Sequence, residues 1–162
     1  MTDDRERLYL DDLEVGQRFA SGPQAVDEAG IKAFAAQFDP QPFHLDGRAA
    51  AASLFGGLAA SGWHTAAVTM RLLVDSVPLA GGVIGAGGEI AWPRPTRPGD
   101  VLTVASEVLE VTPSRSRPDR GMVLLRSETR NQRGEVVQTL TARLVVPRRP
   151  TAGRLPEGNA AG

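Results

Sequence analysis

The chain has 162 residues, a formal net charge of -1 at pH 7 from 18 basic and 19 acidic side chains, and no cysteine. This length suits one domain with a sizeable core and is too short for two of ordinary size. The balanced charge gives no electrostatic basis for binding nucleic acid or an anionic membrane, and the absence of cysteine excludes disulfides, thiolate metal sites and cysteine nucleophiles.

The start of the chain shows no targeting signal. Met1 to Glu6 are polar and acidic, without the basic and then apolar order of a secretory signal. No stretch approaches the ~20 apolar residues of a membrane span. The sequence therefore predicts a soluble, cytoplasmic protein.

The first helix is predicted after an N-terminal segment, residues 1–12, that carries little pattern. A turn at 13–19 leads into a short strand, and Asp27 then provides a helix N-cap. Apolar residues recur at helical spacing along one face: Ile31, Phe34, Ala35 and Phe38. This helix delivers the chain to Asp39.

Residues 38–44 read Phe-Asp-Pro-Gln-Pro-Phe-His and place Asp39 five residues before His44, one of two histidines in the chain. Prolines push the residues before them toward extended geometry, so we expect this segment not to be helical. The chain must bend between the two residues for the carboxylate and the imidazole to share one water. The spacing alone leaves an alternative open, a rigid surface turn in which Asp39 caps the next helix.

Two further helices are predicted, a short one over 46–52 and a longer one over 58–77 that Pro78 ends. The longer helix is small and apolar on most sides, as in a helix buried by a surrounding sheet. Ser61 and Gly62 lie near its start, where unpaired N–H groups and the positive end of the helix dipole make an oxyanion site. Alternatively, Gly62 only allows close packing of helix and sheet. We expect His64, one turn on, to be a core or interface histidine satisfied by a hydrogen bond.

The second half of the chain is predicted to be four consecutive antiparallel strands. They are rich in Val, Leu, Ile and Thr, are separated by turn signals, and cover 84–92, 101–111, 121–131 and 136–146. Helices first and strands second indicate an α+β fold with an antiparallel sheet packed on one long helix. We expect one domain over 13–147 and a disordered tail over 148–162.

Other candidate sites are weaker. The glycines of 85–88 lack the spacing of a dinucleotide loop and precede a strand, so we interpret them as the start of a strand that passes close to the helix. The two histidines and the scattered carboxylates show no metal-ligand spacing, and no metal is expected. Five loop arginines can either meet the phosphates of coenzyme A or lie solvated: Arg94, Arg97, Arg115, Arg117 and Arg120.

Three motifs, at 38–44, 55–64 and 92–100, resemble in order and spacing the MaoC-like dehydratases, the (R)-specific enoyl-CoA hydratase family of the hot-dog fold. The family motif is Asp-x-Asn-Pro-aliphatic-His, whose Asp and His are the catalytic pair and map onto Asp39 and His44. This sequence departs from the motif at Gln41, where Asn is usual, and at Phe43, where a smaller aliphatic residue is usual.

The resemblance implies a hot-dog fold, an antiparallel sheet wrapped around a long central α-helix. It also implies that Asp39 and His44 hold a water that adds to a trans-2-enoyl-CoA, giving the (R)-3-hydroxyacyl-CoA, or that they run the reverse reaction. The Gly62 N–H would receive the thioester oxygen, and no cofactor is needed beyond the coenzyme A thioester as substrate. The expected substrate-binding residues are Phe43, Phe55, Gly57, Ser61, Trp63 and Trp92.

An exposed edge strand predicts a homodimer in which two sheets join, or a higher homo-oligomer. Two other functions remain open at this point: an acyl-CoA thioesterase of the same fold, and a non-catalytic acyl-CoA-binding partner subunit. The presence of both Asp39 and His44 argues against the second of these.

Overall fold

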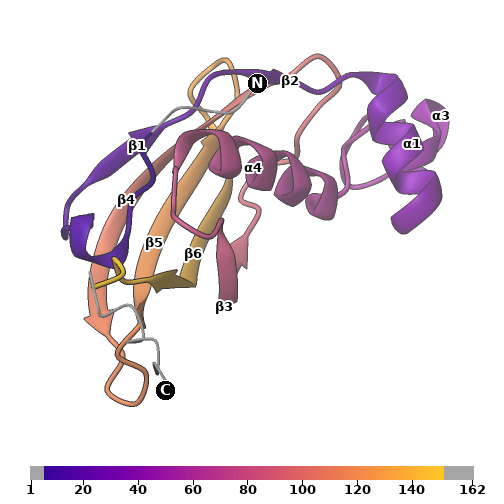
Figure 1. Cartoon of the computed structure of the whole chain (residues 1–162). Coiled ribbons are helices and arrows are strands. Elements are labelled where there is room, and N and C mark those ends of the chain that lie inside the picture. The colour runs from indigo at the N-terminus through magenta and orange to yellow at the C-terminus, as the bar shows by residue number, and fades with distance from the viewer. Residues whose placement is uncertain (1–5, 152–162) are drawn as a thin grey trace, which may run out of the picture.

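An antiparallel sheet curves around one long helix in the computed structural model, which describes residues 6–151 (Figure 1). The long helix is α4 (Gly62–Ser76). The shorter helical elements are η1 (Leu10–Asp12), α1 (Glu28–Phe38), α2 (Pro42–Leu45) and α3 (Gly47–Ala51). The strands are β1 (Arg18–Ala20), β2 (Gln24–Ala25), β3 (Ile84–Ala91), β4 (Val101–Pro113), β5 (Arg120–Arg130) and β6 (Val136–Pro147). The α+β architecture and its four predicted strands are confirmed.

The strands pair in the order β1-β4-β5-β6-β3, every pair is antiparallel, and β2 also pairs with β4. Hairpins join β4 to β5 through the loop 114–119 and β5 to β6 through the loop 131–135. Strand β3 precedes β4 in the chain but pairs with β6, so residues 92–100 carry the chain from the edge of the sheet back across to β4. This crossing loop passes the start of α4, where the Ala60 N–H donates to the Thr96 carbonyl at 2.9 Å.

Helix α4 is shorter and less enclosed than the sequence predicts. It begins at Gly62 rather than at residue 58, because Ser61 has an extended ψ of 139° and caps the helix by accepting from the Trp63 N–H. One face is buried against the sheet, and there the Thr69 hydroxyl bonds the Thr129 hydroxyl of β5 at 2.6 Å. Three large side chains of the helix stay exposed: Trp63, Met70 and Val74. The sheet wraps around this helix as predicted, but it covers one side of the helix and leaves these three side chains exposed on the other.

The helical segment before α4 gathers at one end of it, where α1 and α3 lie together (Figure 1). Helix α1 begins as predicted, with the Asp27 carboxylate accepting from the Gly30 N–H at 2.7 Å. The prediction that residues 38–44 avoid helix is wrong, because Pro42 begins α2 and His44 lies within it. Proline is tolerated at the first helical position, where its missing N–H would have no helical partner.

Two peripheral predictions concern the glycine run and the C-terminal tail. Gly85 to Gly88 lie inside β3, which has a register shift between Gly85 and Gly87, and a Cβ on Gly88 would lie 2.5 Å from the Thr141 carbonyl of β6. The backbone at Gly88 thus passes close to the neighbouring strand β6, and not to the helix as predicted. Arg148 and Arg149, at the start of the expected tail, pair with the carboxylates of Asp11 and Asp12. The rest of that tail from 152 onward lies outside the described residues.

Candidate active site

Asp39 and His44 are brought together where helix α1 ends. Asp39 caps that helix, and its N–H donates to the Ala35 carbonyl at 2.9 Å. The chain then turns, because the Gln41 N–H donates to the Asp39 carbonyl at 2.7 Å and the His44 N–H donates to the Gln41 carbonyl at 3.0 Å. The turn leaves Asp39 Oδ2 3.3 Å from His44 Nε2. The predicted bend is confirmed. The N-cap position of the helix that follows is Gln41, not Asp39, and the Gln41 side chain makes no capping hydrogen bond.

The buried ring of His44 is oriented by a backbone carbonyl. Its Nδ1 lies 2.6 Å from the carbonyl oxygen of Ala59. A carbonyl only accepts, so Nδ1 carries a hydrogen, and in the neutral ring Nε2 is then a lone-pair acceptor. Nε2 faces Asp39 Oδ2. Two acceptors side by side at this distance suit a water molecule that donates to both of them.

Neutral groups hold Asp39 in its ionised form. Burial raises the pKa of its carboxyl group, but hydrogen bonds from Ser61 and Gln41, together with His44, outweigh burial and leave the pKa below its ordinary value. The Gln41 amide donates to Asp39 Oδ1 at 2.5 Å. Gln41 was not among the expected site residues, although its place at the Asn position of the family motif was a usable signal.

Gly62 is the first residue of α4, and among the described residues its N–H has no acceptor. The same helix end uses the Ser61 hydroxyl to accept from Trp63 N–H. A Cβ on Gly62 would lie 2.8 Å from ring atoms of Trp92. Glycine is therefore required for packing, as the alternative interpretation held, but the partner is Trp92 and the free N–H beside it still suits an oxyanion.

A cavity of about 410 Å³ joins the histidine to this helix end. It is lined by Gln41, Phe43, His44, Phe55, Ala60, Gly62, Thr65, Trp92, Arg94, Pro95 and Thr96. The structure thus brings together His44, Gly62 and three of the expected substrate-binding residues, Phe43, Phe55 and Trp92. The crossing loop 92–100 supplies the opposite wall, a contribution that its distance in sequence from the dyad does not reveal.

Three expected substrate-binding residues do not line this cavity. Ser61 is fully buried and bonds the Asp39 carboxylate, so it supports the dyad. The carbonyl of Gly57 accepts from Arg97 at 2.9 Å. Trp63 is 60% exposed and packs edge-to-face on Trp92, with ring centroids 5.2 Å apart. Trp63 instead lines a separate apolar groove of about 320 Å³ between α4 and strand β3.

His64 lies outside the cavity, stacked on the ring of Phe34 with centroids 4.8 Å apart. Burial lowers the pKa of its ring, and the charge of Asp27 offsets this only in part. Its buried Nδ1 has no hydrogen-bond partner within residues 6–151. The expected packing role fits, whereas the expected hydrogen bond is wrong at this atom.

The five loop arginines divide into three sets. Arg94 lines the cavity and pairs with Glu135 at 3.4 Å. The guanidinium of Arg97 donates hydrogen bonds to backbone carbonyls. The remaining three line another cavity around the β4–β5 loop, at the end of the sheet far from α1 and α3 (Figure 1): Arg115, Arg117 and Arg120. Of the five, only Arg94 can meet a ligand in the cavity of the dyad.

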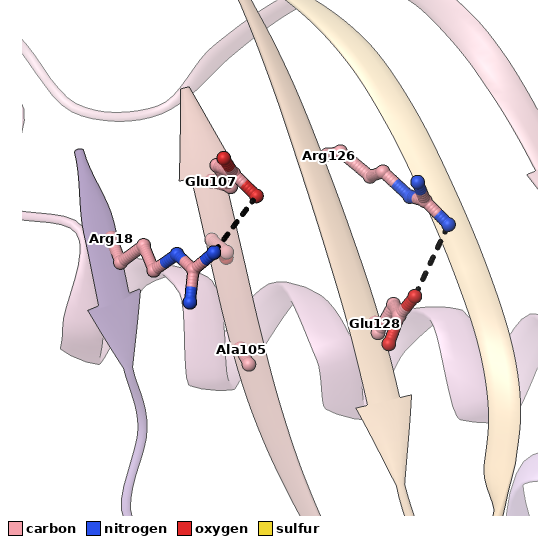
Figure 2. Close-up of a pocket in the computed structure, with 6 residues that line it drawn as sticks. Arg18, Ala105, Glu107, Arg126 and Glu128 are labelled. Carbon is pink, nitrogen blue, oxygen red and sulfur yellow. Dashed lines mark hydrogen bonds and ion pairs between the residues drawn. The ribbon is translucent and has the colours of Figure 1, made fainter. Parts of the chain in front are cut away.

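A groove on the outer face of the sheet offers a contrasting cluster of charges. Figure 2 shows it on the side of the strands away from the helix. Arg18 pairs there with Glu107 at 3.9 Å, and Arg126 pairs with Glu128 at 3.2 Å. The two arginines are exposed and the two glutamates partly exposed, and each charge is matched by a permanent opposite charge, so this groove has no free general base.

Two further searches of the described residues concern metals and membranes. No cluster of three or more potential metal-ligating side chains occurs within residues 6–151. No helix in that range has the length and apolar character to span a bilayer.

An antiparallel sheet wraps around a long helix, and a partly buried aspartate–histidine pair lies near the free Gly62 N–H at the start of that helix. The architecture is that of a hot-dog protein. A family model described as the MaoC like domain matches residues 13–129. The chain therefore belongs to the MaoC-like dehydratase family, and the resemblance of its three motifs is confirmed.

Solved structures and a characterised relative agree with this assignment. A MaoC-like dehydratase from Rhodospirillum rubrum is 66% identical, with a TM-score of 0.87 over 89% of this chain and 99% of the other. The R-hydratase PhaJ1 from Pseudomonas aeruginosa is 29% identical, with a TM-score of 0.70 over 93% and 94%. A 3-hydroxybutyryl-CoA dehydratase from Methylorubrum extorquens is 33% identical over 68% of this chain and 69% of its own. The hot-dog fold is confirmed.

Proposed function

We propose that this protein interconverts a trans-2-enoyl-CoA and the (R)-3-hydroxyacyl-CoA. The observation that carries the proposal is the pair formed by the buried His44 and the partly buried Asp39, in which Asp39 Oδ2 and His44 Nε2 lie 3.3 Å apart and both face one another as acceptors. Such a pair holds a water and can take its proton. The names of the R-hydratase and of the 3-hydroxybutyryl-CoA dehydratase support the same chemistry.

In the proposed hydration each of these groups has one role. The water between the dyad adds its oxygen to C3 of the enoyl thioester while one of its protons passes to His44 Nε2. Electron density moves to the thioester oxygen, which the Gly62 N–H stabilises. The dyad then returns the proton to C2, so that the net change is addition of one water. Asp39, ionised and held by Ser61 and Gln41, orients the water and stabilises the imidazolium.

The proposal includes a homodimer formed through the edge strand β3. Its residues are exposed along almost the whole strand, and one edge carries no partner within the described chain. Exposed apolar side chains lie on β3 itself and on helix α4, whose Trp63 and Met70 line a groove with β3: Trp63, Met70, Val74 and Ile84. Pairing two β3 strands would satisfy the free backbone groups and cover this apolar surface. Sedimentation of the protein should therefore give a dimer mass.

The setting of the reaction completes the proposal. An enoyl-CoA substrate would place the protein in fatty acid metabolism. The cytoplasmic location, the domain limits 13–147 and the lack of any cofactor requirement stay predictions of the sequence.

A panel of thioesters tests the proposed reaction against its thioesterase alternative. With crotonyl-CoA, the absorbance of the conjugated double bond should fall without release of thiol. With butyryl-CoA, which lacks that double bond, neither signal should change. Stoichiometric thiol from butyryl-CoA would favour the thioesterase, and binding of both without any turnover would favour a non-catalytic subunit.

A further inference from the structure

Arg97 binds the backbone of a segment forty residues earlier in the chain. Its guanidinium donates to the Gly57 carbonyl at 2.9 Å, to the Leu58 carbonyl at 3.3 Å, and to the Phe55 carbonyl as well. It is half-buried, and no carboxylate pairs with its guanidinium among the described residues. The N–H donors of an arginine guanidinium have a fixed planar geometry. Three backbone carbonyls bound to one guanidinium are therefore held in fixed positions relative to one another.

The segment that Arg97 holds leads directly to the carbonyl that orients the catalytic histidine. Ala59 follows Leu58, and its carbonyl accepts from His44 Nδ1 at 2.6 Å. On the other side of Ala59, the Ala60 N–H donates to the carbonyl of Thr96 at 2.9 Å. Neighbouring residues of the crossing loop thus clamp the backbone before and after Ala59.

The crossing loop is itself anchored. The Arg97 N–H donates to Asp100 Oδ2 at 2.8 Å, and the Gln132 amide donates to Asp100 Oδ1 at 3.0 Å. The Thr96 hydroxyl bonds the Thr65 hydroxyl of α4 at 2.9 Å. Asp100 and Thr96 are both buried. The backbone of Arg97 is therefore held in place, and the three hydrogen bonds of its guanidinium hold the segment 55–58 in place relative to the crossing loop.

We propose that Arg97 is a positioning residue that sets the tautomer and the place of His44 through the Ala59 carbonyl. With the carbonyl fixed, the neutral ring keeps its hydrogen on Nδ1 and presents an unprotonated Nε2 to the water. Without the three bonds, the segment 55–59 can relax and the other tautomer, with its hydrogen on Nε2, becomes accessible. The consequence for turnover rests on the proposed function, whereas the tautomer itself does not.

Nitrogen NMR of protein labelled with nitrogen-15 histidine tests the proposal, since the chain has only two histidines and His44→Ala assigns the signals. In the unmodified protein at a pH where the ring is neutral, His44 should show a single Nδ1-protonated tautomer. Arg97→Met removes the donors while keeping a long apolar stem, and should give a mixture of tautomers. Arg126→Met is the matched control, because that arginine lies in an exposed ion pair on the outer face (Figure 2), and it should leave the His44 spectrum unchanged.

Turnover gives the second measurement. Arg97→Met should lower kcat for crotonyl-CoA by roughly 10- to 100-fold, the range for a small misplacement of a catalytic group, with a smaller change in KM. Arg97→Lys keeps the charge but not the fork, so it should recover only part of both signals, and it replaces the Met variant if that one does not fold. A folded Arg97 variant with an unmixed His44 tautomer and full kcat would overturn the proposal. A mixed tautomer in a protein that hydrates no enoyl-CoA would instead reject the proposed function and keep the role of Arg97.

Discussion

The dyad and the outer face of the sheet both hold an acidic side chain within ion-pair distance of a basic one, yet only one of them can do acid–base chemistry. On the outer face, the side chains of Arg18 and Glu107 are 79% and 42% exposed. At the dyad, those of Asp39 and His44 are 17% and 5% exposed. Water screens the first pair, and arginine does not release its proton near neutral pH.

The difference lies in what surrounds the carboxylate. The pKa of Asp39 is kept below its ordinary value by hydrogen bonds from a hydroxyl and an amide, groups that carry no charge and so do not neutralise the carboxylate. The Ala59 carbonyl orients that imidazole without neutralising it. A catalytic pair therefore needs burial and neutral donors, and a short distance between opposite charges is not enough.

The largest effect is expected at the dyad itself. Asp39→Asn and His44→Ala should each lower the hydration rate by roughly 100- to 10,000-fold while the protein stays folded, because each removes a positioned acid or base. The double variant should cost little more than the worse single one, since the two residues act as a unit. Steady-state rates with crotonyl-CoA measure this, and near-normal turnover in either single variant would remove the dyad from the mechanism.

A smaller loss is expected at the helix start. Gly62→Val places a branched side chain where Trp92 now packs, so the helix start or the ring must move relative to the dyad. Loss of one oxyanion donor costs about 3 kcal/mol, and kcat/KM should fall on the order of 100-fold. His64→Ala, on the same helix turn, should keep ordinary turnover.

The double variant Gly62→Val with Trp92→Ala separates two explanations of that loss. It restores space for the side chain without restoring the ordered helix start. If its activity returned to that of Trp92→Ala alone, Gly62 would serve only as a spacer beneath the ring. An inactive His64→Ala beside an active Gly62→Val would make the second histidine the group that faces the substrate.

A still smaller effect concerns pH. The Gln41 amide favours the ionised form of Asp39, so Gln41→Leu should raise the pKa of that carboxyl group toward its ordinary value. The acid limb of the rate profile should then move to higher pH, with little change at the plateau. The pKa of Asp39 is lower in the folded protein than in the unfolded chain, where it is about 4, so the ionised carboxylate stabilises the folded state. This contribution to the free energy of unfolding is fully present above the unfolded-state pKa and is lost as the pH falls through the folded-state pKa. Melting curves from pH 3 to 7 should therefore show a weaker acid dependence in Gln41→Leu, and an unshifted acid limb would contradict this role of Gln41.

The least effect is expected on the outer face. Arg126→Ala breaks an exposed ion pair with Glu128, so it should change the free energy of unfolding by no more than about 1 kcal/mol and leave kcat unaltered. Urea titration and the crotonyl-CoA assay measure the two quantities. A large loss of activity would mean that the outer face communicates with the cavity.

The sequence predicts the parts of this molecule that depend on local patterns. Capping at Asp27, the apolar alternation of the strands and the order of helices before strands fix most of the elements. The motif at 38–44 identifies Asp39 and His44 through family resemblance, and its prolines correctly predict a bend. The same prolines suggested the wrong local structure, because one of them begins α2.

What the sequence does not show depends on contacts between distant segments. Nothing local indicates that β3 pairs with β6 rather than with β4, or that Trp92 would pack on Gly62. Arg97 is indistinguishable in sequence from a solvated loop arginine, and only the crossing of 92–100 over the start of α4 brings it to the carbonyls of 55–58.

The most direct test of the central claim is to follow the oxygen of the water that we propose the dyad to hold. Crotonyl-CoA is incubated with the enzyme in water enriched in oxygen-18, and the products are separated by mass and by chirality. Water held between Asp39 and His44 should place the label in the hydroxyl of (R)-3-hydroxybutyryl-CoA with the thioester intact, and His44→Ala should abolish that product. Label found in a free carboxylate, or an unlabelled and unchanged thioester, would contradict the account.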